Sequence, residues 1–558
     1  MRREGSRHRT LLGVVVAVVL AITGPGRVGA EGQAPGPRAA TGVEFASIAE
    51  ADVRTWLTAL SSDVMQGRGA FTEGYGLAAA YVAEQLAAMG ATPLGIEGGY
   101  LQPVTRYAYR VTRNSTITVE AGGKTQTFAH GENVSFPALA GSPQTLRFSG
   151  VDFVGYGLPA TADTAPLPGN RLVVLLPGTP NGQGGRRSAM AERAGALIGR
   201  GAAAAIVMSA VPAPQAAGTG GRRATPTIDL TTVQRVDRRR PPIVTGNETF
   251  FEFLMSGAPQ PFEELRSRAQ RGQSLDAFTL ADVSVTIAID HTYEVITAER
   301  THNVVAMVPG SDPALRDTYV VFGAHLDHVG AVTGERAPGR ANVPITEDPI
   351  WNGADDDGSG SSAVLAVAKA MMTGPRPKRS TLFVWHTAEE DGLLGSQAMA
   401  DEPVVPLAAM QAVFNIDMIG RNRDNDPGQA NAVYLIGADR ISTDLHNVIE
   451  QANQRPSQPL TLDYHYNDPA DTESFYTRSD HYSYASKGVP VAFFFTGTHP
   501  DYHANTDTVD KILFPKLVRI TQLIYEAGFS VANSAAPLRR DNLGPRAGRG
   551  FKGLLPAP

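Results

Sequence analysis

The stretch Thr381-Leu-Phe-Val-Trp-His-Thr-Ala-Glu-Glu390 joins an apolar run to two adjacent acids. The run Thr381–Trp385 is typical of a buried strand in a parallel sheet. Glu389 and Glu390 follow it, and two neighbouring carboxylates repel each other unless cations or a shared proton balance their charge. The stretch therefore predicts a parallel strand that ends at a site where this charge is balanced.

The sequence around this stretch alternates between apolar runs and helical patterns from about residue 300 onward. Strands are expected at 303–308, 318–322, 381–385, 412–416 and 489–495, and helices at 361–372, 442–454 and 514–527. Two further helices are expected at 48–60 and 75–89. Strands that alternate with helices predict an α/β fold with a doubly wound, mostly parallel sheet and helices on both faces.

The segment from about 111 to 288 has a different character. It contains short alternating strands and many Gly, Pro and Ser turns, which predict a small β-rich domain inserted into the α/β domain. The predicted organisation is then a signal peptide at 1–30, a flexible lead-in at 31–44, the first part of the α/β domain at 45–110, the insert at 111–288, the core at 289–535 and a disordered tail at 536–558.

The first thirty residues predict export. Four arginines precede an apolar stretch from Leu11 to Ile22, and small residues at 28–30 follow it, as in a cleaved secretory signal. The apolar stretch is too short to span a membrane easily. We therefore expect a secreted or periplasmic protein without a stable membrane anchor after cleavage.

Charge and cysteine content exclude several classes of function. Removing the five Arg and one Glu of residues 1–30 lowers the net charge from −6 to −10, which argues against a nucleic-acid partner. The chain has no cysteine, so disulfides, thiolate metal sites and a Cys nucleophile are excluded. The oligomeric state is not indicated.

Acids and histidines recur where the predicted strands end. In open α/β sheets, ligands bind beyond the carboxyl ends of the strands. The residues found there, or just before the helix at 361–372, are His325, Asp327, Asp356, Glu389, Glu390, Asp417 and His503. Adjacent acids alone usually begin a helix, and an Asp triplet alone is usually an N-cap. Four such coincidences at different strands instead indicate one shared site.

The donor types suit a hydrolytic site with two metal ions. Nitrogen and carboxylate donors without thiolate favour zinc, and less often cobalt or manganese. Two metals that share a carboxylate need about five protein ligands, and a further carboxylate can then serve as general base toward water. The sequence therefore predicts a metal-dependent hydrolase.

Five motifs, in this order, resemble the M28 family of zinc aminopeptidases. They are Gly323-Ala-His-Leu-Asp-His-Val-Gly330, Asn352-Gly-Ala-Asp-Asp-Asp-Gly-Ser-Gly360, Thr387-Ala-Glu-Glu-Asp-Gly-Leu-Leu-Gly-Ser396, Asn415-Ile-Asp-Met-Ile-Gly420 and Tyr502-His503. The resemblance covers about 45–105 and 290–530. The insert resembles, more weakly, the protease-associated (PA) domain of that family.

The resemblance implies two zinc ions per chain and a role for each residue. His325 and Asp417 would bind one ion, Glu390 and His503 the other, and Asp356 both. Glu389 would be the general base, Tyr502 would donate its phenol to the developing oxyanion, and Asp327 would orient a ligand histidine. Three further histidines, His328 within the first motif and His386 and His499 outside the motifs, are interpreted as bystanders.

The expected activity is removal of N-terminal residues from peptides. The alternatives are a carboxypeptidase, for which Arg421, Arg423 or Arg478 would have to hold the substrate carboxylate, a glutaminyl cyclase with one zinc, and a non-catalytic receptor of the same fold. The run Ser479-Asp480-His481 offers the residue types of a hydrolase triad. Sequence neighbours rarely have triad geometry and no Gly-x-Ser-x-Gly elbow is present, so we reject that interpretation.

Overall fold

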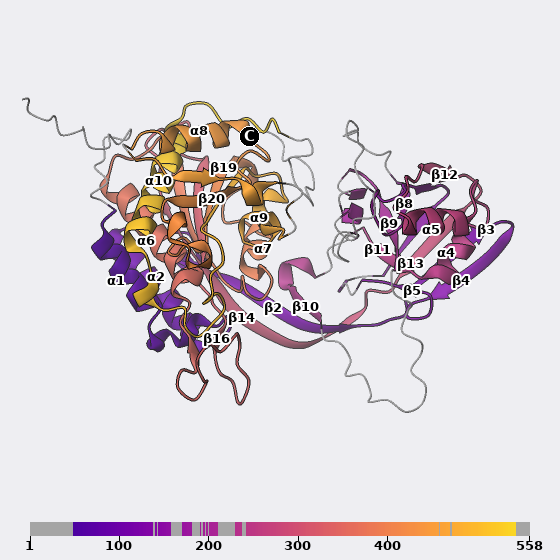
Figure 1. Cartoon of the computed structure of the whole chain (residues 1–558), viewed down its shortest axis with the longest axis horizontal. Helices are drawn as coiled ribbons and strands as arrows, with labels where there is room; N and C mark the ends of the chain where they lie inside the picture. Colours follow the sequence, from indigo (N-terminus) through magenta and orange to yellow (C-terminus); the bar gives the residue numbers. More distant parts are fainter. Residues whose placement is uncertain are drawn as a thin grey trace, which may run out of the picture.

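The computed structural model describes residues 48–542, except 138–139, 142, 158–169, 181–189, 191–192, 196, 199, 210–228, 237–240, 457, 469–470 and 472. The described chain forms two parts joined by a long antiparallel ribbon (Figure 1). The ribbon consists of β2 (Leu101–Val111) and β14 (Tyr293–Val308). The predicted signal peptide and lead-in at 1–44 lie outside the described residues.

The larger sheet contains ten strands in the described chain. Their order is β10-β2-β14-β18-β15-β19-β22-β20-β21, with β1 beside β14. The four central strands β18, β15, β19 and β22 are parallel, whereas the ribbon strands and β20 join them antiparallel. The remaining bounds are β1 (Thr92–Pro93), β10 (Asp229–Thr232), β15 (Tyr319–His325), β18 (Ser380–His386), β19 (Met410–Ile416), β20 (Ala432–Ile436), β21 (Thr461–Asp463) and β22 (Val491–Phe495).

Helices cover both faces of this sheet (Figure 1), which confirms the α/β fold. One face carries α1 (Glu50–Leu60), α2 (Glu73–Met89), α6 (Gly360–Thr373), α8 (Thr443–Asn453) and α10 (Phe514–Asn533), and the other carries α7 (Leu394–Asp401) and α9 (His481–Ala485). Alternate strand residues point to opposite faces, so Val320 and Phe322 pack in one core and Val321 in the other. All seven residues of β18 are buried, as its apolar sequence predicts.

The second part contains two sheets with their own apolar core. One sheet has the order β12-β7-β8-β9-β11-β5, and the other β4-β3-β13-β6. The bounds are β3 (Thr116–Ala121), β4 (Lys124–Ala129), β5 (Val134–Ser135), β6 (Gln144–Phe148), β7 (Val151–Phe153), β8 (Leu172–Leu175), β9 (Ala204–Met208), β11 (Ile243–Gly246), β12 (Phe278–Leu280), β13 (Ser284–Ile289), α4 (Glu248–Leu254) and α5 (Phe262–Gln270).

One segment of the predicted insert belongs to the larger sheet. Strand β10 pairs antiparallel with β2, and Arg235, just beyond it, forms an ion pair of 2.8 Å with the buried carboxylate of Asp401 at the end of α7. Strands β2 and β14, which flank the predicted insert, pair with each other along the ribbon. Strand pairing between distant segments leaves no local signal that could have indicated either feature.

The chain termini add two observations. Residues 536–542, which the sequence assigned to a disordered tail, lie against the larger domain, where Arg539 pairs with Asp444 on α8. The rest of the predicted tail lies outside the described residues. No helix in the described part of the chain is long and apolar enough to cross a membrane.

Candidate metal centre

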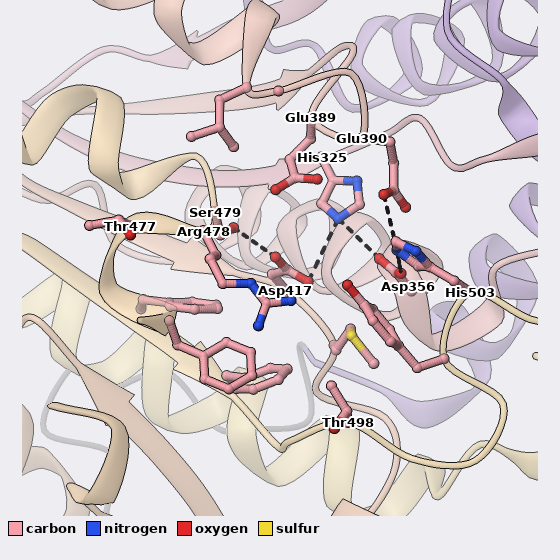
Figure 2. A pocket seen from close by; sticks show the side chains of 17 residues that line it. His325, Asp356, Glu389, Glu390, Asp417, Thr477, Arg478, Ser479, Thr498 and His503 are labelled. Carbon is pink, nitrogen blue, oxygen red and sulfur yellow. Dashed lines mark hydrogen bonds and ion pairs between the residues drawn. The ribbon is translucent and has the colours of Figure 1, made fainter. Parts of the chain in front are cut away.

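The carboxyl ends of the central parallel strands place the candidate residues together. His325 ends β15, Asp417 follows β19, and Glu389 and Glu390 follow β18. Asp356 lies in the turn Ala354–Ser359 before α6, and His503 lies in the loop after β22. Together with Tyr502 they line one cavity of about 400 Å³ (Figure 2). The sequence-based prediction of a shared location agrees with this arrangement.

Two donor groups share the carboxylate of Asp356. Its Oδ1 lies 3.2 Å from Nε2 of His325, which is 3.6 Å from Oδ1 of Asp417. Its Oδ2 lies 3.1 Å from Nε2 of His503, which is 3.0 Å from Oε2 of Glu390. Figure 2 shows these contacts as two clusters meeting at Asp356. The carboxylate is thus placed to bind an ion on each side.

The donor groups fit metal ions by their chemistry. Asp356 is 2% exposed, and its Oδ2 has no well-aligned hydrogen bond from any described residue. A buried carboxylate oxygen without such a bond is costly unless a cation satisfies it. Imidazole nitrogens with carboxylate oxygens are zinc ligands, and three of them leave a position open for water or substrate. The residues present therefore fit zinc on both sides of Asp356.

Charge coupling between these groups is strong. For His503, burial alone would lower the imidazole pKa, but the close carboxylates of Asp356 and Glu390 outweigh burial and raise the pKa to about 10. Burial would raise the pKa of Asp356, yet contacts with His325 and His503 hold it well below its usual range. The paired histidines thus keep the central carboxylate ionised, which is the form that binds a metal.

Glu389 lies in a different environment from Glu390. Burial raises the pKa of Glu389 well above its ordinary value, and although His325 opposes this effect, the neighbouring charge of Glu390 adds to it. Burial and the charge of Asp356 would raise the pKa of Glu390. The imidazoles of His328 and His503 outweigh both effects and lower it. Two adjacent carboxyl groups with pKa values moved in opposite directions suit a proton acceptor beside a ligand.

Asp327 contacts the site differently from the expectation. Its carboxylate accepts hydrogen bonds from the backbone N–H groups of Glu389 (3.1 Å) and Glu390 (3.3 Å). Nδ1 of His325 is 3.0 Å from the backbone carbonyl of Asp327 and 3.9 Å from its carboxylate. The side chain therefore positions the turn that carries both glutamates, and its main chain orients the histidine.

The two outer members of the Asp triplet accept hydrogen bonds from backbone N–H groups and do not line the cavity. The carboxylate of Asp357 accepts hydrogen bonds from the N–H groups of His325, Gly360 and Met418, at 3.2, 2.8 and 3.1 Å. Asp355 accepts from Gly420 N–H at 2.6 Å. These contacts fix three strand-end turns around Asp356 and explain why only the middle Asp is available as a ligand.

Three turns at the site hold non-glycine residues in the left-handed region. These are Ala388 (φ 51°), directly before Glu389, Met418 (φ 55°), directly after Asp417, and His503 itself (φ 52°). Such residues cost on the order of 1 kcal/mol or more and persist where the surrounding structure over-determines them. Each of these turns aims a candidate ligand or base into the cavity.

The histidines interpreted as bystanders divide into two groups. His386 contacts Tyr484 and Asp480, and His499 contacts Asp355, so both lie behind the donor groups. His328, by contrast, belongs to the second donor group, since its Nδ1 lies 3.0 Å from Oε1 of Glu390. Its position directly after the His-Leu-Asp motif was the only signal in the sequence.

The rejected triad does not form. Ser479 donates a hydrogen bond to Asp417 at 2.7 Å, Asp480 pairs with His386, and His481 stacks on Phe493. These three neighbours therefore support three different parts of the site and the core. Ser479 contributes by fixing the Asp417 carboxylate, a contact that no pattern in the sequence indicates.

Arg68 is a supporting residue that sequence reasoning missed. It is 1% exposed, and its guanidinium donates to the carbonyls of Leu60, Leu326, Asn352 and Gly353 at 2.7–2.8 Å. It thereby ties the segment after α1 to the loop that carries Asp356. A single Arg between two glycines carries no sequence pattern for such a role.

Replacement of Arg68 by Met should destabilise the protein. Methionine fills similar volume but donates no hydrogen bond, so four buried carbonyls lose their partner, at a cost on the order of 3 kcal/mol or more. Urea denaturation with a chelator present measures the free energy of unfolding. The control is Arg54→Met, which removes an exposed i,i+4 ion pair. This variant should change the free energy of unfolding by less than about 1 kcal/mol. Equal stabilities of the two variants would contradict the assigned role.

Comparison with known proteins finds similar sequences over the part of the chain that contains the candidate site. The sequence model of peptidase family M28 matches residues 303–528. Leucine aminopeptidase 1 of Sclerotinia sclerotiorum is 28% identical over 243 residues, which are 41% of this chain and 56% of that protein. Leucine aminopeptidase 1 of Fusarium vanettenii is 29% identical over 245 residues, or 41% of this chain and 55% of that protein. The chain thus spans just over half the length of these curated relatives.

A solved structure, the aminopeptidase from Aneurinibacillus sp. strain AM-1, aligns with 89% of this chain and 96% of its own at 20% identity and a TM-score of 0.42. The region matched by the family model contains β15, β18, β19 and β22 and every candidate ligand. Over residues 303–528 this chain is thus similar in sequence to peptidase family M28.

Proposed function

We propose that this protein is an exported aminopeptidase with two zinc ions. The observation that carries the proposal is the pair of donor groups that meet at Asp356, with Glu389 beside them in one cavity. His325 and Asp417 would hold one ion, Glu390 and His503 the other, and Asp356 both. The ions, when bound, would polarise the scissile carbonyl and make water more acidic.

The protein's own groups would then move the proton and stabilise charge. Glu389, with its raised pKa, would accept a proton from the attacking water and deliver it to the leaving amine. Tyr502 also lines the cavity, and burial, with the nearby charges of Asp356 and Glu390, raises the pKa of its phenol. The phenol therefore stays protonated and can donate to the developing oxyanion.

The acidic cavity favours a substrate with a free amine. Four carboxyl groups line it, those of Asp356, Glu389, Glu390 and Asp417. They would attract an ammonium group and repel a substrate carboxylate. The matched family and the names of the curated relatives agree with removal of N-terminal residues.

A carboxypeptidase is the second candidate, because one arginine does line the cavity. Arg478 extends along it beside Asp417 (Figure 2), with its guanidinium 4.5 Å from the ring of Phe475. Arg421 is instead buried against Asp501, and Arg423 lies over Tyr434 outside the cavity lining. Only Arg478 of the three arginines could hold a carboxylate at the site.

Cleavage polarity distinguishes these two functions. Amino-acyl p-nitroanilides with a free amine should be hydrolysed, and acetylation of that amine should abolish the reaction, because the acidic groups then have no ammonium to bind. Chromogenic assays of both substrate forms measure this. Trimming of N-blocked peptides from the carboxyl end, lost in Arg478→Ala, would instead establish the carboxypeptidase.

A glutaminyl cyclase and a non-catalytic receptor are less well supported. The cyclase would use one zinc, whereas donors on both sides of Asp356 suit two ions. A non-catalytic receptor would not need its metal ligands or a general base. In this chain all the expected metal ligands and the expected base line the cavity or contact it. We also propose that residues 111–288 are a PA-like domain and that residues 1–30 direct secretion or periplasmic export.

A further inference from the structure

His328 faces the same carboxylates as His503. Its Nδ1 lies 3.0 Å from Oε1 of Glu390 and 3.7 Å from Oδ2 of Asp356. His503 approaches Oε2 of Glu390 and the same Oδ2 of Asp356. The two imidazole rings meet edge to face, with centroids 5.7 Å apart. The two oxygens of Glu390 thus each face a different histidine.

The surroundings of His328 fix its ring. The residue is 1% exposed, and its backbone N–H donates to the carbonyl of Arg68 at 3.2 Å. The ring packs directly on Gly353, where an added Cβ would lie 2.6 Å from the ring carbon Cγ. Gly353 has a φ of 57° and precedes the turn of Asp356. The ring is therefore preorganised before any ion binds.

The two ring nitrogens of His328 differ in their polar contacts. Nε2 is buried and has no hydrogen-bond partner among the described residues. Nδ1, the other nitrogen, points at Glu390 and Asp356, and these three donors lie within 4.8 Å of one another. The buried His328 ring thus contacts two carboxylates that are themselves candidate metal ligands. This position suits a further ligand of the same ion.

We infer that His328 is a fourth protein ligand, through Nδ1, of the metal site formed by Asp356, Glu390 and His503. The inference rests on the proposed dinuclear function. The site of His325, Asp356 and Asp417 then has three protein ligands, and the two sites are unequal. The site that contains His328 binds its ion more tightly and fills first.

Metal titration of the purified full-length protein tests this inference. Zinc affinity is measured by competition with a chromogenic chelator, and the visible absorption of the cobalt form reports coordination. The variants are His328→Ala and His328→Asn, because the Asn Nδ2 can replace Nδ1 as a hydrogen-bond donor toward Glu390 but is a poor zinc ligand. His465→Asn, at an exposed histidine, is the matched control.

Wild type should bind two ions, one more tightly than the other. Both His328 variants should weaken the tighter site by at least about tenfold and alter the cobalt spectrum, while the weaker site and His465→Asn stay unchanged. Wild-type affinity in His328→Asn but not His328→Ala would show a hydrogen-bonding role and overturn the inference. Unchanged affinity in both variants would also overturn it, and leave the proposed function intact.

A wild-type protein that binds no metal would overturn the proposed function together with the inference. Thermal denaturation in the presence of a chelator separates loss of folding from loss of binding for each variant. Because His328→Asn preserves a polar donor in the buried position, it remains informative even where His328→Ala does not fold.

Discussion

Glu389→Gln should lower kcat by roughly 10²–10⁴-fold while leaving bound zinc near the wild-type amount. Glutamine has the size of glutamate but cannot accept the proton that a general base must take. The backbone hydrogen bond from Glu389 N–H to Asp327 does not involve the replaced group, so the turn should stay in place. Steady-state kinetics and metal analysis on the same sample measure both quantities.

Glu390→Gln is the matched control for this prediction. Its carboxylate lies 3.0 Å from both His328 and His503, so its loss should lower metal occupancy as well as activity. The two adjacent variants thus separate proton transfer from metal binding. A Glu389→Gln variant that loses zinc, beside a Glu390→Gln variant that keeps it, would reverse the two assignments.

Asp356→Ala should lose both ions and all measurable activity. Its two oxygens face His325 on one side and His503 on the other, and no described carboxylate stands between these histidines in its place. His503→Ala should weaken mainly the ion on its own side of Asp356, because His325 and Asp417 remain on the other side. Metal content per chain is measured by inductively coupled plasma mass spectrometry after dialysis.

Asp510→Ala, which removes an exposed carboxylate that does not line the cavity, is the control for general effects of charge. It should retain both ions. Full activity of the wild type after exhaustive chelation, or one ion retained at full occupancy in Asp356→Ala, would refute the bridging role. Restoration of activity by zinc after mild chelation is the expected result for wild type.

Much of the fold could be predicted from local patterns. The strand predicted at Thr381–Trp385 is observed as β18, and the helix predicted at 361–372 is observed as α6. Buried parallel strands have nearly continuous apolar sequences, and packed helices have a 3.6-residue period, so both leave local signals. Strand β10 was missed because its pairing with β2 depends on two segments far apart in the sequence.

The chemistry of the site was also largely determined by the sequence. The order of strands and helices places every candidate acid and histidine except Asp356 beyond a carboxyl strand end, and such ends meet at one edge of a parallel sheet. That rule predicts that His325, Asp417 and the two glutamates share a site. The resemblance to peptidase family M28 supplied the expected role of each residue.

The tertiary structure alone decided which groups support and complete that site. Arg68 donates to carbonyls of the Asp356 loop, His328 faces Glu390, and the Asp327 carboxylate holds the turn of both glutamates. These contacts depend on left-handed turns and on the packing of loops from separate strands. Periodicity in the sequence reports which face of an element is buried, but it carries no information about which distant group a buried polar side chain meets, because that is fixed only when the elements pack.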